Sequence, residues 1–357
     1  MGVHPSADRG LVHPPILVVP VNSFPIPRWY AVAGRVLRSV ARAIGSPRVA
    51  AWPASDAGPV WIHAASLGEI KGAIRLAEAI ADHASVVATS TTSAGLAKLR
   101  RELPRARSGL LPLDERSVVD SFLDAVRPSC AVFLEAEAWP ATLAALSERW
   151  IPVAFAAFRD GPASIARWNR FSLLFPGWTD SVHTVWTGDP GRVAAVSDLG
   201  FRDVRPGTSL KWAGIPACPS DPSATRSAAI SIHTRDLPVL PKLVAHWPGT
   251  GWLWYPRRLS LRIPLRLLAR ALGLRIVDRP SPDPGEVWIA PRFGMVAQTL
   301  PVCRRAWVSA GHDLEEPRIL GVAEVFAGDP PLRAASAQDA PEAVLRQILS
   351  WAVSVRK

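Results

Sequence analysis

The chain has 357 residues, of which 48% are hydrophobic and 20% are charged, a balance that excludes a mainly disordered chain. This length suits one large or two ordinary globular domains. The formal charge of +11 comes almost wholly from arginine, which favours anionic partners such as nucleic acid, phosphorylated substrates or acidic lipid, or else reflects an arginine-rich proteome.

Cysteine and histidine usage argues against a metal site. Cys130, Cys218 and Cys303 are far apart, so neither a disulfide framework nor a CxxC metal site is expected. The eight histidines form no HExxH motif. We predict no metal and no cofactor, and the reducing cytoplasm fits, since no secretory signal is recognised.

The N-terminal extension, residues 1–48, contains an apolar stretch and then an amphipathic one. Five prolines between Leu11 and Pro27 make a membrane-spanning helix implausible. From Trp29 to Ile44, Arg35, Arg38 and Arg42 share a narrow arc at 100° per residue, opposite an apolar set made of Trp29, Val32, Val36, Val40 and Ile44. This basic helix fits a membrane surface or docking on its own domain, and periodicity does not separate the two.

From residue 60 onward, short β-like runs alternate with helical runs, which is typical of βαβ units around a parallel sheet. The predicted strands are Val60–Ala64, Ser85–Thr89, Cys130–Glu135, Ile151–Phe158 and Val182–Trp186. The predicted helices are Glu69–Asp82, Ala94–Glu102, Arg116–Val126, Pro140–Arg149 and Gly191–Leu199. Residues 49–212 are therefore expected to form a Rossmann-like domain.

A second, smaller Rossmann-like domain is expected after a linker at residues 213–227, which are rich in Pro, Ser and Ala. The alternation resumes over residues 228–357, with strand-like runs at Ala228–Ile232, Gly251–Tyr255, Glu286–Ile289, Ala306–Ser309 and Ala323–Phe326 and helical runs at Leu259–Leu272 and Glu342–Val353. The last helix is assigned to this second domain, and the alternative is that it packs against the first domain. Two such domains facing across a cleft make the α/β architecture called GT-B.

Three loops that follow predicted strands carry candidate site residues, because ligands bind beyond the carboxyl ends of parallel strands. After the first strand, Ser66, Gly68 and Glu69 open a helix, where Glu69 is either a general base or a helix cap. The second loop brings Thr91 and Thr92, which bind a phosphate or sugar or cap the next helix. The third brings Glu135 and Glu137, two carboxylates suited to hydroxyl binding or acid–base work.

Together these motifs resemble the 3-deoxy-D-manno-octulosonic acid (Kdo) transferase family. WIHAASLGE (Trp61–Glu69) matches the family's WIHAASxGE, and TSTTSAG, LPLD (Leu111–Asp114) and EAEAWP (Glu135–Pro140, with Trp139) follow in the family's order. Arg159 and Ser164 are kept in the next motif, where Ala157 replaces an Asn, and SLKW keeps Lys211. The order and spacing extend over about 150 residues, which coincidence does not explain.

The C-terminal half matches the family less well. Arg257 in YPRR, and Gly311, His312, Asp313 and Glu316 in GHDLEEP, correspond to family positions that the resemblance assigns to donor binding. A glycine-rich loop before Gly311 is shortened to Ser309-Ala310, and Met295 replaces an acidic residue. Backbone N–H groups of glycine loops cradle phosphates, so these losses bear on the donor side.

The resemblance implies transfer of Kdo from CMP-Kdo to the lipid A precursor, by a protein peripherally attached to the cytoplasmic face of the inner membrane. Glu69 would be the catalytic base. The acceptor-binding residues would be Ser66, Gly68, Thr91, Thr92, Glu135, Glu137, Trp139 and Arg159. The donor-binding residues would be Lys211, Arg257, Gly311, His312, Asp313 and Glu316.

Two alternatives stay open. A degenerate paralogue would keep the acceptor side but use another donor or only bind glycolipid, and the shortened glycine loop favours it. A nucleic-acid-binding protein is suggested by the basic charge and fifteen tryptophans, but the arginines are dispersed and no nucleic-acid-binding motif is present, so we predict no nucleic-acid partner. Most tryptophans, including Trp168 and Trp186, are expected in the core.

Overall fold

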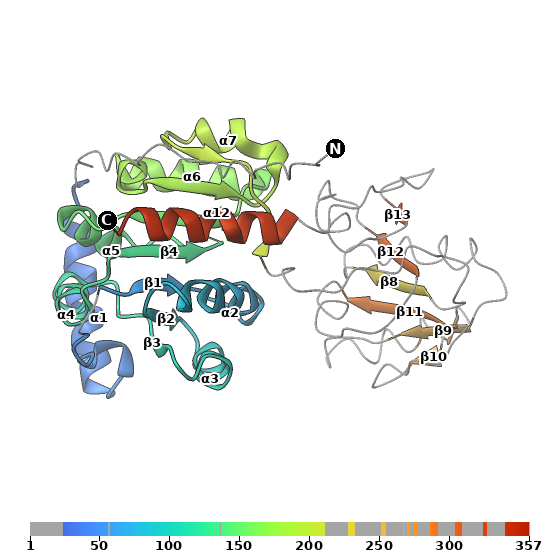
Figure 1. Cartoon of the computed structure of the whole chain (residues 1–357), viewed down its shortest axis with the longest axis horizontal. Helices are drawn as coiled ribbons and strands as arrows, with labels where there is room; N and C mark the ends of the chain where they lie inside the picture. The colour runs from blue at the N-terminus through green and yellow to red at the C-terminus, as the bar shows by residue number, and fades with distance from the viewer. Residues whose placement is uncertain are drawn as a thin grey trace, which may run out of the picture. The chain divides into compact units, whose positions relative to one another are not determined.

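The computed structural model of the chain describes residues 24–55, 58–135, 137–210 and 340–356, with shorter stretches at 228–232, 251–254, 267, 270–271, 275–276, 286–291, 304–308 and 324–326. The chain folds into two compact units (Figure 1). Unit 1 comprises Met1–Pro206 and Leu345–Lys357, and unit 2 comprises Gly207–Val344. The predicted linker at residues 213–227 lies outside the described residues.

Unit 1 is built on a seven-stranded sheet whose strand pairs are all parallel. Its strands are β1 (Val60–His63), β2 (Val86–Ser90), β3 (Arg107–Leu110), β4 (Cys130–Leu134), β5 (Val153–Phe158), β6 (Thr184–Thr187) and β7 (Val204–Arg205). Their spatial order is β3-β2-β1-β4-β5-β6-β7. The first strand, β1, lies inside the sheet. The chain adds β2 and β3 on one side of β1 and then β4 to β7 on its other side, so the strand order reverses between β1 and β4.

Helices connect these strands on both faces of the sheet, which is why the central strands are apolar runs buried on both sides. The connecting helices are α2 (Leu67–Ala81), α3 (Ser93–Glu102), α4 (Arg116–Val126), α5 (Pro140–Glu148), α6 (Pro162–Leu174) and α7 (Val193–Ser197), and α1 (Arg28–Ala43) precedes β1. Short 3₁₀ turns occupy Pro47–Val49, Trp178–Ser181 and Pro190–Arg192. Among the described residues, no helix combines the length and hydropathy that crossing a membrane requires.

Local signals in the sequence account for where these helices begin. The side chains of Ser66, Thr92 and Glu115 accept hydrogen bonds from backbone N–H groups in the first turns of α2, α3 and α4. Helices α5 and α6 each begin with proline, whose missing N–H would have no partner in a first turn.

An aromatic core lies on one face of the sheet. The rings of Phe155 and Phe158 contact Trp178 and Trp168, which stack on each other with centroids 5.4 Å apart. Trp168 and Trp186 are buried, so the prediction that these tryptophans serve in packing is confirmed.

The C-terminal helix α12 (Ala340–Ser354) returns to unit 1, although the sequence-based boundary placed residues 345–357 in the second domain. Its residues Ile348, Trp351 and Ala352 are buried, and Trp351 meets Trp186 of β6 edge to face at 6.2 Å. Gln347 accepts a hydrogen bond from the Trp186 indole at 3.0 Å. The apolar face of this helix is thus buried by unit 1.

Unit 2 contains a six-stranded sheet that is also parallel throughout. Its strands are β8 (Ala228–Ile232), β9 (Gly251–Trp254), β10 (Arg275–Ile276), β11 (Glu286–Pro291), β12 (Arg304–Val308) and β13 (Glu324–Phe326), in the order β10-β9-β11-β8-β12-β13. Here too the chain starts in the middle and reverses direction, so each unit has the doubly wound form.

Candidate active site

The predicted acceptor-side residues of unit 1 gather where the strand order reverses. Glu69 follows β1, Glu135 and Glu137 follow β4, and Arg159 follows β5. Strands β1, β4 and β5 are adjacent and parallel, so their carboxyl ends share one edge of the sheet. In doubly wound sheets this switch point is the usual ligand site.

Glu69 is buried and accepts four hydrogen bonds. Its Oε2 atom accepts from the backbone N–H groups of Ala65 and Ser66 at 2.8 and 3.2 Å. Its Oε1 atom accepts from the Ser66 hydroxyl at 2.8 Å and from the Arg159 guanidinium at 2.8 Å. Ser66 and Glu69 thus form a capping box at the start of α2, as the capping interpretation predicted.

Arg159 bridges two of the carboxylates. Its Nη2 atom lies 2.8 Å from Glu69 Oε1, and its Nε atom lies 3.1 Å from Glu135 Oε2. Burial lowers the pKa of Arg159, but the charges of Glu135 and Glu69 outweigh burial and raise it. The bridge holds the ends of β1, β4 and β5 together by charge-assisted hydrogen bonds.

The backbone around this bridge adopts an unusual conformation. Glu135 and Ala157, at the ends of β4 and β5, have φ values of 53° and 55°, in the left-handed region that non-glycine residues rarely enter. Such strain costs on the order of 1–3 kcal/mol at a residue and tends to persist at functional sites. At Glu135 it accompanies the ion pair with Arg159.

Glu137 completes the acidic group and is half-buried. Burial raises its pKa, and the negative charge of Glu69 raises it further, whereas Arg159, Arg48 and Arg167 act in the opposite direction. The environment of Glu137 therefore disfavours its charged form more than water does.

The remaining predicted residues are close by, but their contacts are structural. Thr91 donates a hydrogen bond from its hydroxyl to the Ala65 carbonyl at 2.9 Å, and Thr92 caps α3 by accepting from Gly95 N–H. Gly68 lies inside the first turn of α2, where the helix itself sets the backbone conformation. A Cβ there would meet only Ser66 Oγ at 3.8 Å, an ordinary contact.

Two buried polar groups lie beside the acidic cluster, one on the predicted residue Trp139 and one on His63, which sequence reasoning missed. His63 Nε2 and Trp139 Nε1 are both buried without a hydrogen-bond partner in the described part of the chain, and their rings are 6.4 Å apart. Burial lowers the pKa of His63 to about 3, so the ring is neutral at pH 7. The position of His63 inside the WIHAAS motif was the available signal.

A further missed residue, Asp114 of the LPLD motif, anchors the wall of the site. It accepts hydrogen bonds from the backbone N–H groups of Ala141 and Thr142 and from the Tyr30 hydroxyl at 2.6 Å. Burial raises its pKa, and these hydrogen bonds partly offset that effect. Asp114 therefore fixes the start of α5, immediately after Trp139.

The predicted donor-binding residues lie outside the described residues: Lys211, Arg257, Gly311, His312, Asp313 and Glu316. In the part of the chain that the structure describes, no group of His, Cys, Asp and Glu could hold a metal ion.

Residues 38–213 match the sequence profile of a family described as 3-deoxy-D-manno-octulosonic-acid transferase (kdotransferase). The N-terminal half of this chain is a domain of the Kdo transferase family. The resemblance to this family is thereby confirmed for residues 38–213, and the profile ends before the first strand of unit 2.

Individual relatives agree with the family match. The 3-deoxy-D-manno-octulosonic acid transferase of Bordetella pertussis is 34% identical over 133 residues, which are 35% of this chain and 29% of the relative. A probable mitochondrial Kdo transferase of Arabidopsis thaliana is 31% identical over 122 residues, covering 32% of this chain and 27% of the relative. The Rickettsia bellii enzyme is 38% identical over 88 residues, covering 24% and 21%. The matches therefore span less than a third of each relative.

Solved structures confirm the fold over a larger part of the chain. A UDP-N-acetylglucosamine 2-epimerase aligns with a TM-score of 0.52 at 10% identity, covering 83% of this chain and 96% of that one. A putative UDP-N-acetylglucosamine 2-epimerase from Listeria monocytogenes aligns with a TM-score of 0.51 at 11% identity, covering 84% and 90%. At such identities the likeness concerns fold alone, and it confirms the expected α/β fold of GT-B type.

Proposed function

We propose that this protein is a Kdo glycosyltransferase that moves Kdo from CMP-Kdo to a lipid A precursor. The observation that carries the proposal is the Glu69–Arg159–Glu135 bridge with Glu137 beside it, at the switch point of the sheet. These four residues belong to the stretch that matches the family. An acidic cluster of this kind suits the binding and deprotonation of a sugar hydroxyl.

In the proposed reaction, the acceptor hydroxyl replaces Arg159 at Glu69 Oε1 and gives its proton to this oxygen. The acceptor oxygen then attacks the anomeric carbon of Kdo, and the bond between that carbon and the CMP phosphate oxygen breaks. Arg159 is 43% exposed and keeps Glu135 as its second partner, so it can release Glu69 without losing every ion pair. CMP leaves with the electron pair of the broken bond.

The proposed acceptor is a phosphorylated glycolipid, so the transferase would work peripherally at the cytoplasmic face of the inner membrane. The formal charge of +11 supports contact with such an anionic surface. The donor-side residues named above would bind CMP-Kdo.

The decisive experiment compares transfer from CMP-Kdo to a lipid A precursor by the wild type and by Glu69→Gln. We expect the rate to fall at least ~100-fold, since the amide cannot accept the proton. The capping box is also weakened, because the Gln amide would face the Ser66 hydroxyl and Arg159, so a stability loss of about 0.5–2 kcal/mol is expected as well. Rates are therefore measured well below the unfolding temperature.

Glu115→Gln is a matched control for this loss of stability. Glu115 is likewise a buried carboxylate that caps a helix, α4, and pairs with an arginine, Arg38. It should lose a similar amount of stability and transfer Kdo within about twofold of wild type. Normal transfer by Glu69→Gln would contradict the base assignment, and a wild type without turnover would favour the binding-only paralogue.

A further inference from the structure

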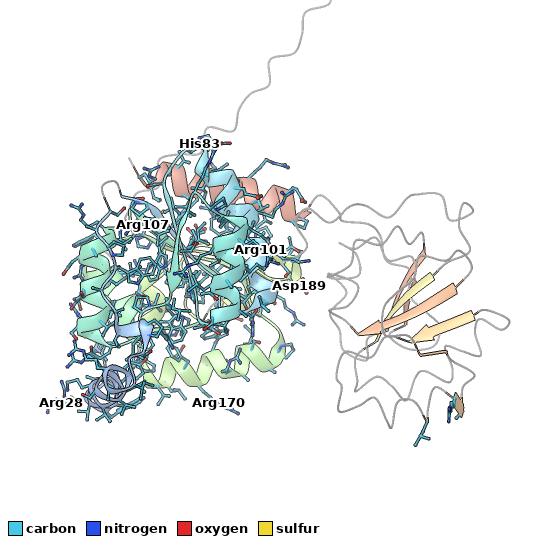
Figure 2. All side chains as sticks on the ribbon, turned by 90° about the horizontal axis from the view of Figure 1, so that it is seen from below. Arg28, His83, Arg101, Arg107, Arg170 and Asp189 are labelled. Atoms are coloured by element: carbon cyan, nitrogen blue, oxygen red, sulfur yellow. The ribbon has the colours of Figure 1, made fainter. Side chains whose placement is uncertain are left out.

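The carboxyl edge of the unit 1 sheet holds two N–H groups that the proposed reaction does not use. His63 ends β1, and Trp139 is the N-terminal cap residue of α5. In Figure 2, Asp189, which follows β6, marks this edge, and Arg107, which begins β3, lies on another side of unit 1. His63 Nε2 and Trp139 Nε1 are buried and have no hydrogen-bond partner among the described residues. A buried polar group without a partner destabilises the fold, so two of them beside a candidate site point to a ligand that supplies the partner.

Neighbouring side chains assign the hydrogen of the neutral His63 ring to Nε2. The Trp61 indole N–H donates to Thr89 Oγ1 at 2.8 Å, and His63 Nδ1 lies 2.9 Å from the same oxygen. The Thr89 hydroxyl is buried and finds no other acceptor in the described part of the chain, so its hydrogen goes to His63 Nδ1. The ring hydrogen is then on Nε2, which makes this atom a donor, as the Trp139 indole always is.

The topology of the sheet gives the direction of the His63 donor. The two ring nitrogens of histidine point to different sides of the ring, and Nδ1 faces Thr89 on β2. Strand β1 lies between β2 and β4, so Nε2 faces the side on which β4 ends. Trp139 follows β4, and its ring centroid is 6.4 Å from that of His63. Both N–H groups can therefore reach the oxygens of one bound group.

Trp139 is not needed to cap the helix that it precedes. Ser, Thr, Asp and Asn are the usual cap residues, and Trp139 makes no side-chain cap bond. Asp114 caps α5 instead, by accepting from the Ala141 and Thr142 backbone N–H groups at 3.1 and 2.8 Å. Asp114 also accepts from the Tyr30 hydroxyl, which docks α1 on its own domain, one of the two sequence-based interpretations of that helix. The half-buried Trp139 side chain is thus left for another role.

Arg48 adds a positive charge to this corner of the site. Its guanidinium carbon lies 5.7 Å from the centroid of the Trp139 ring. Its Nε and Nη2 atoms donate to the Leu111 and Pro112 carbonyls at 3.0 and 3.4 Å, which fixes the side chain in place. Burial lowers the pKa of Arg48, and two nearby carboxylates offset this only in part. In the described part of the chain Arg48 forms no ion pair, so its charge lacks a direct partner.

We propose that His63 Nε2, Trp139 Nε1 and Arg48 form an oxyanion subsite that binds a phosphate group of the sugar acceptor beside Glu69. All three groups only donate hydrogen bonds, and an oxyanion only accepts them and brings the negative charge that Arg48 lacks. The choice of the acceptor rests on the proposed function, because these residues share one edge of unit 1 with the acidic cluster assigned to the acceptor hydroxyl. A carboxylate has the same chemistry, and the experiment separates the two.

Binding of inorganic phosphate is the first test, because it needs neither a sugar donor nor transfer. In the full-length protein, the ¹⁵N signals of the Trp139 indole and of His63 Nε2 should shift with phosphate along a saturable curve at constant ionic strength. The loss of one indole signal in Trp139→Phe identifies Trp139. Arg48→Gln should weaken phosphate binding about tenfold or more, since it removes the charge. Tighter binding of acetate than of phosphate would overturn the assignment to a phosphate.

Transfer kinetics separate the subsite from a structural role. Trp139→Phe keeps a ring and removes the N–H, so it should raise the KM for the lipid A precursor about tenfold, with kcat within about threefold and the KM for CMP-Kdo unchanged. His63→Leu should act in the same direction. His63→Gln carries an amide nitrogen near the position of Nε2 and should stay within about threefold of wild type.

Trp351→Phe is the matched control. Trp351 is also a buried indole of unit 1 whose N–H has no partner among the described residues, and no arginine described by the structure lies over its ring. This variant should bind phosphate and acceptor as the wild type does. Unmoved nitrogen signals in the wild type, or an equal acceptor KM in Trp139→Phe and the wild type, would overturn the subsite. Saturable phosphate binding by a wild type that transfers no Kdo would support the subsite and count against the proposed function.

Discussion

Glu69 and Asp160 are both buried carboxylates at the edge of the unit 1 sheet that carries the candidate site, but they differ in the hydrogen-bond donors and cations around them. Glu69 is matched by four donors, one of them the Arg159 guanidinium. Asp160 accepts hydrogen bonds from the backbone N–H groups of Gly188 and Asp189, at 2.8 and 2.9 Å, and both bonds reach the same oxygen. Among the described residues no cation pairs with Asp160, so its charge is poorly compensated.

Burial raises the pKa of Asp160 from 3.8 to about 6, and this shift makes stability depend on pH. The folded state holds the proton more tightly than the unfolded state, so the contribution of Asp160 is most favourable below pH 4 and is lost as pH rises through 6. The loss amounts to about 2–3 kcal/mol, at 1.36 kcal/mol per pKa unit. We expect Asp160→Asn to recover it at pH 7, because the amide oxygen can accept both backbone hydrogen bonds without a charge.

Chemical unfolding of the wild type and Asp160→Asn at pH 4, 5, 6 and 7 checks this prediction. The stability difference should be near zero at pH 4 and grow in favour of the variant by pH 7. A variant that is less stable at pH 7 would show that the Asn N–H₂ group is left without an acceptor.

At the scale of elements, the helices and strands with a strong hydrophobic periodicity are predicted from the sequence, and those without one are missed. Helix α4 has its predicted bounds, and β1, β4 and α5 differ from theirs by one residue at one end. Strand β3 was missed because RSGL is an edge strand with only half-buried residues, where Gly109 lets Trp52 pack closely. Helix α6 was missed because its core-facing row, Ile165, Trp168 and Phe171, is obscured in the sequence by exposed leucines and arginines.

Some features of the candidate site could likewise be predicted from the sequence, and others could not. Motif order predicted that Glu69, Glu135, Glu137 and Arg159 follow their strands, and topology then brought them to one edge. The Arg159 bridge and the partnerless nitrogens of His63 and Trp139 depend on side-chain packing across three strands, which one sequence does not encode locally.

The end of α5 provides a test of backbone strain. Trp150 has a φ of 57° and lies just after the helix cap, where Ile151 N–H bonds to the Leu146 carbonyl and Trp150 N–H to the Ser147 carbonyl. This Schellman pattern favours glycine at the position of Trp150, because a side chain costs about 1–2 kcal/mol in the left-handed region. The indole is 56% exposed, so little burial is lost by removing it.

We expect Trp150→Gly to raise the free energy of unfolding by about 0.5–1 kcal/mol, after allowing for the greater freedom of glycine in the unfolded chain. Thermal and urea unfolding measure the change. Trp150→Ala is the control, since it removes the indole and keeps the Cβ, and it should give no gain. Equal gains in both variants would assign the effect to the exposed indole rather than to the backbone.

At the scale of the whole molecule, the chain starts and ends in the same unit. Helix α12 follows unit 2 in the sequence but packs on unit 1. Unit 1 is therefore formed from two segments of the chain that are separated by the whole of unit 2. Arg356 donates a hydrogen bond to the His83 carbonyl at 3.0 Å, and Ala352 lies against Cys130 of β4. Local sequence patterns predicted the helix, but long-range packing decides which unit it stabilises.

Trp351 is the side chain through which this closure can be tested. It is 2% exposed, packs against Trp186, and its indole N–H has no hydrogen-bond partner among the described residues. Trp351→Ala should cost about 3–5 kcal/mol, the usual loss for a large buried aromatic side chain. Trp351→Phe keeps a ring and removes the unpaired N–H, so it should cost less than about 1.5 kcal/mol. Hydrogen exchange of the β4 and β6 amides in urea reports on unit 1 directly. If those amides exchange alike in Trp351→Ala and the wild type, unit 1 is stable without its last helix, and the closure has no part in holding it together.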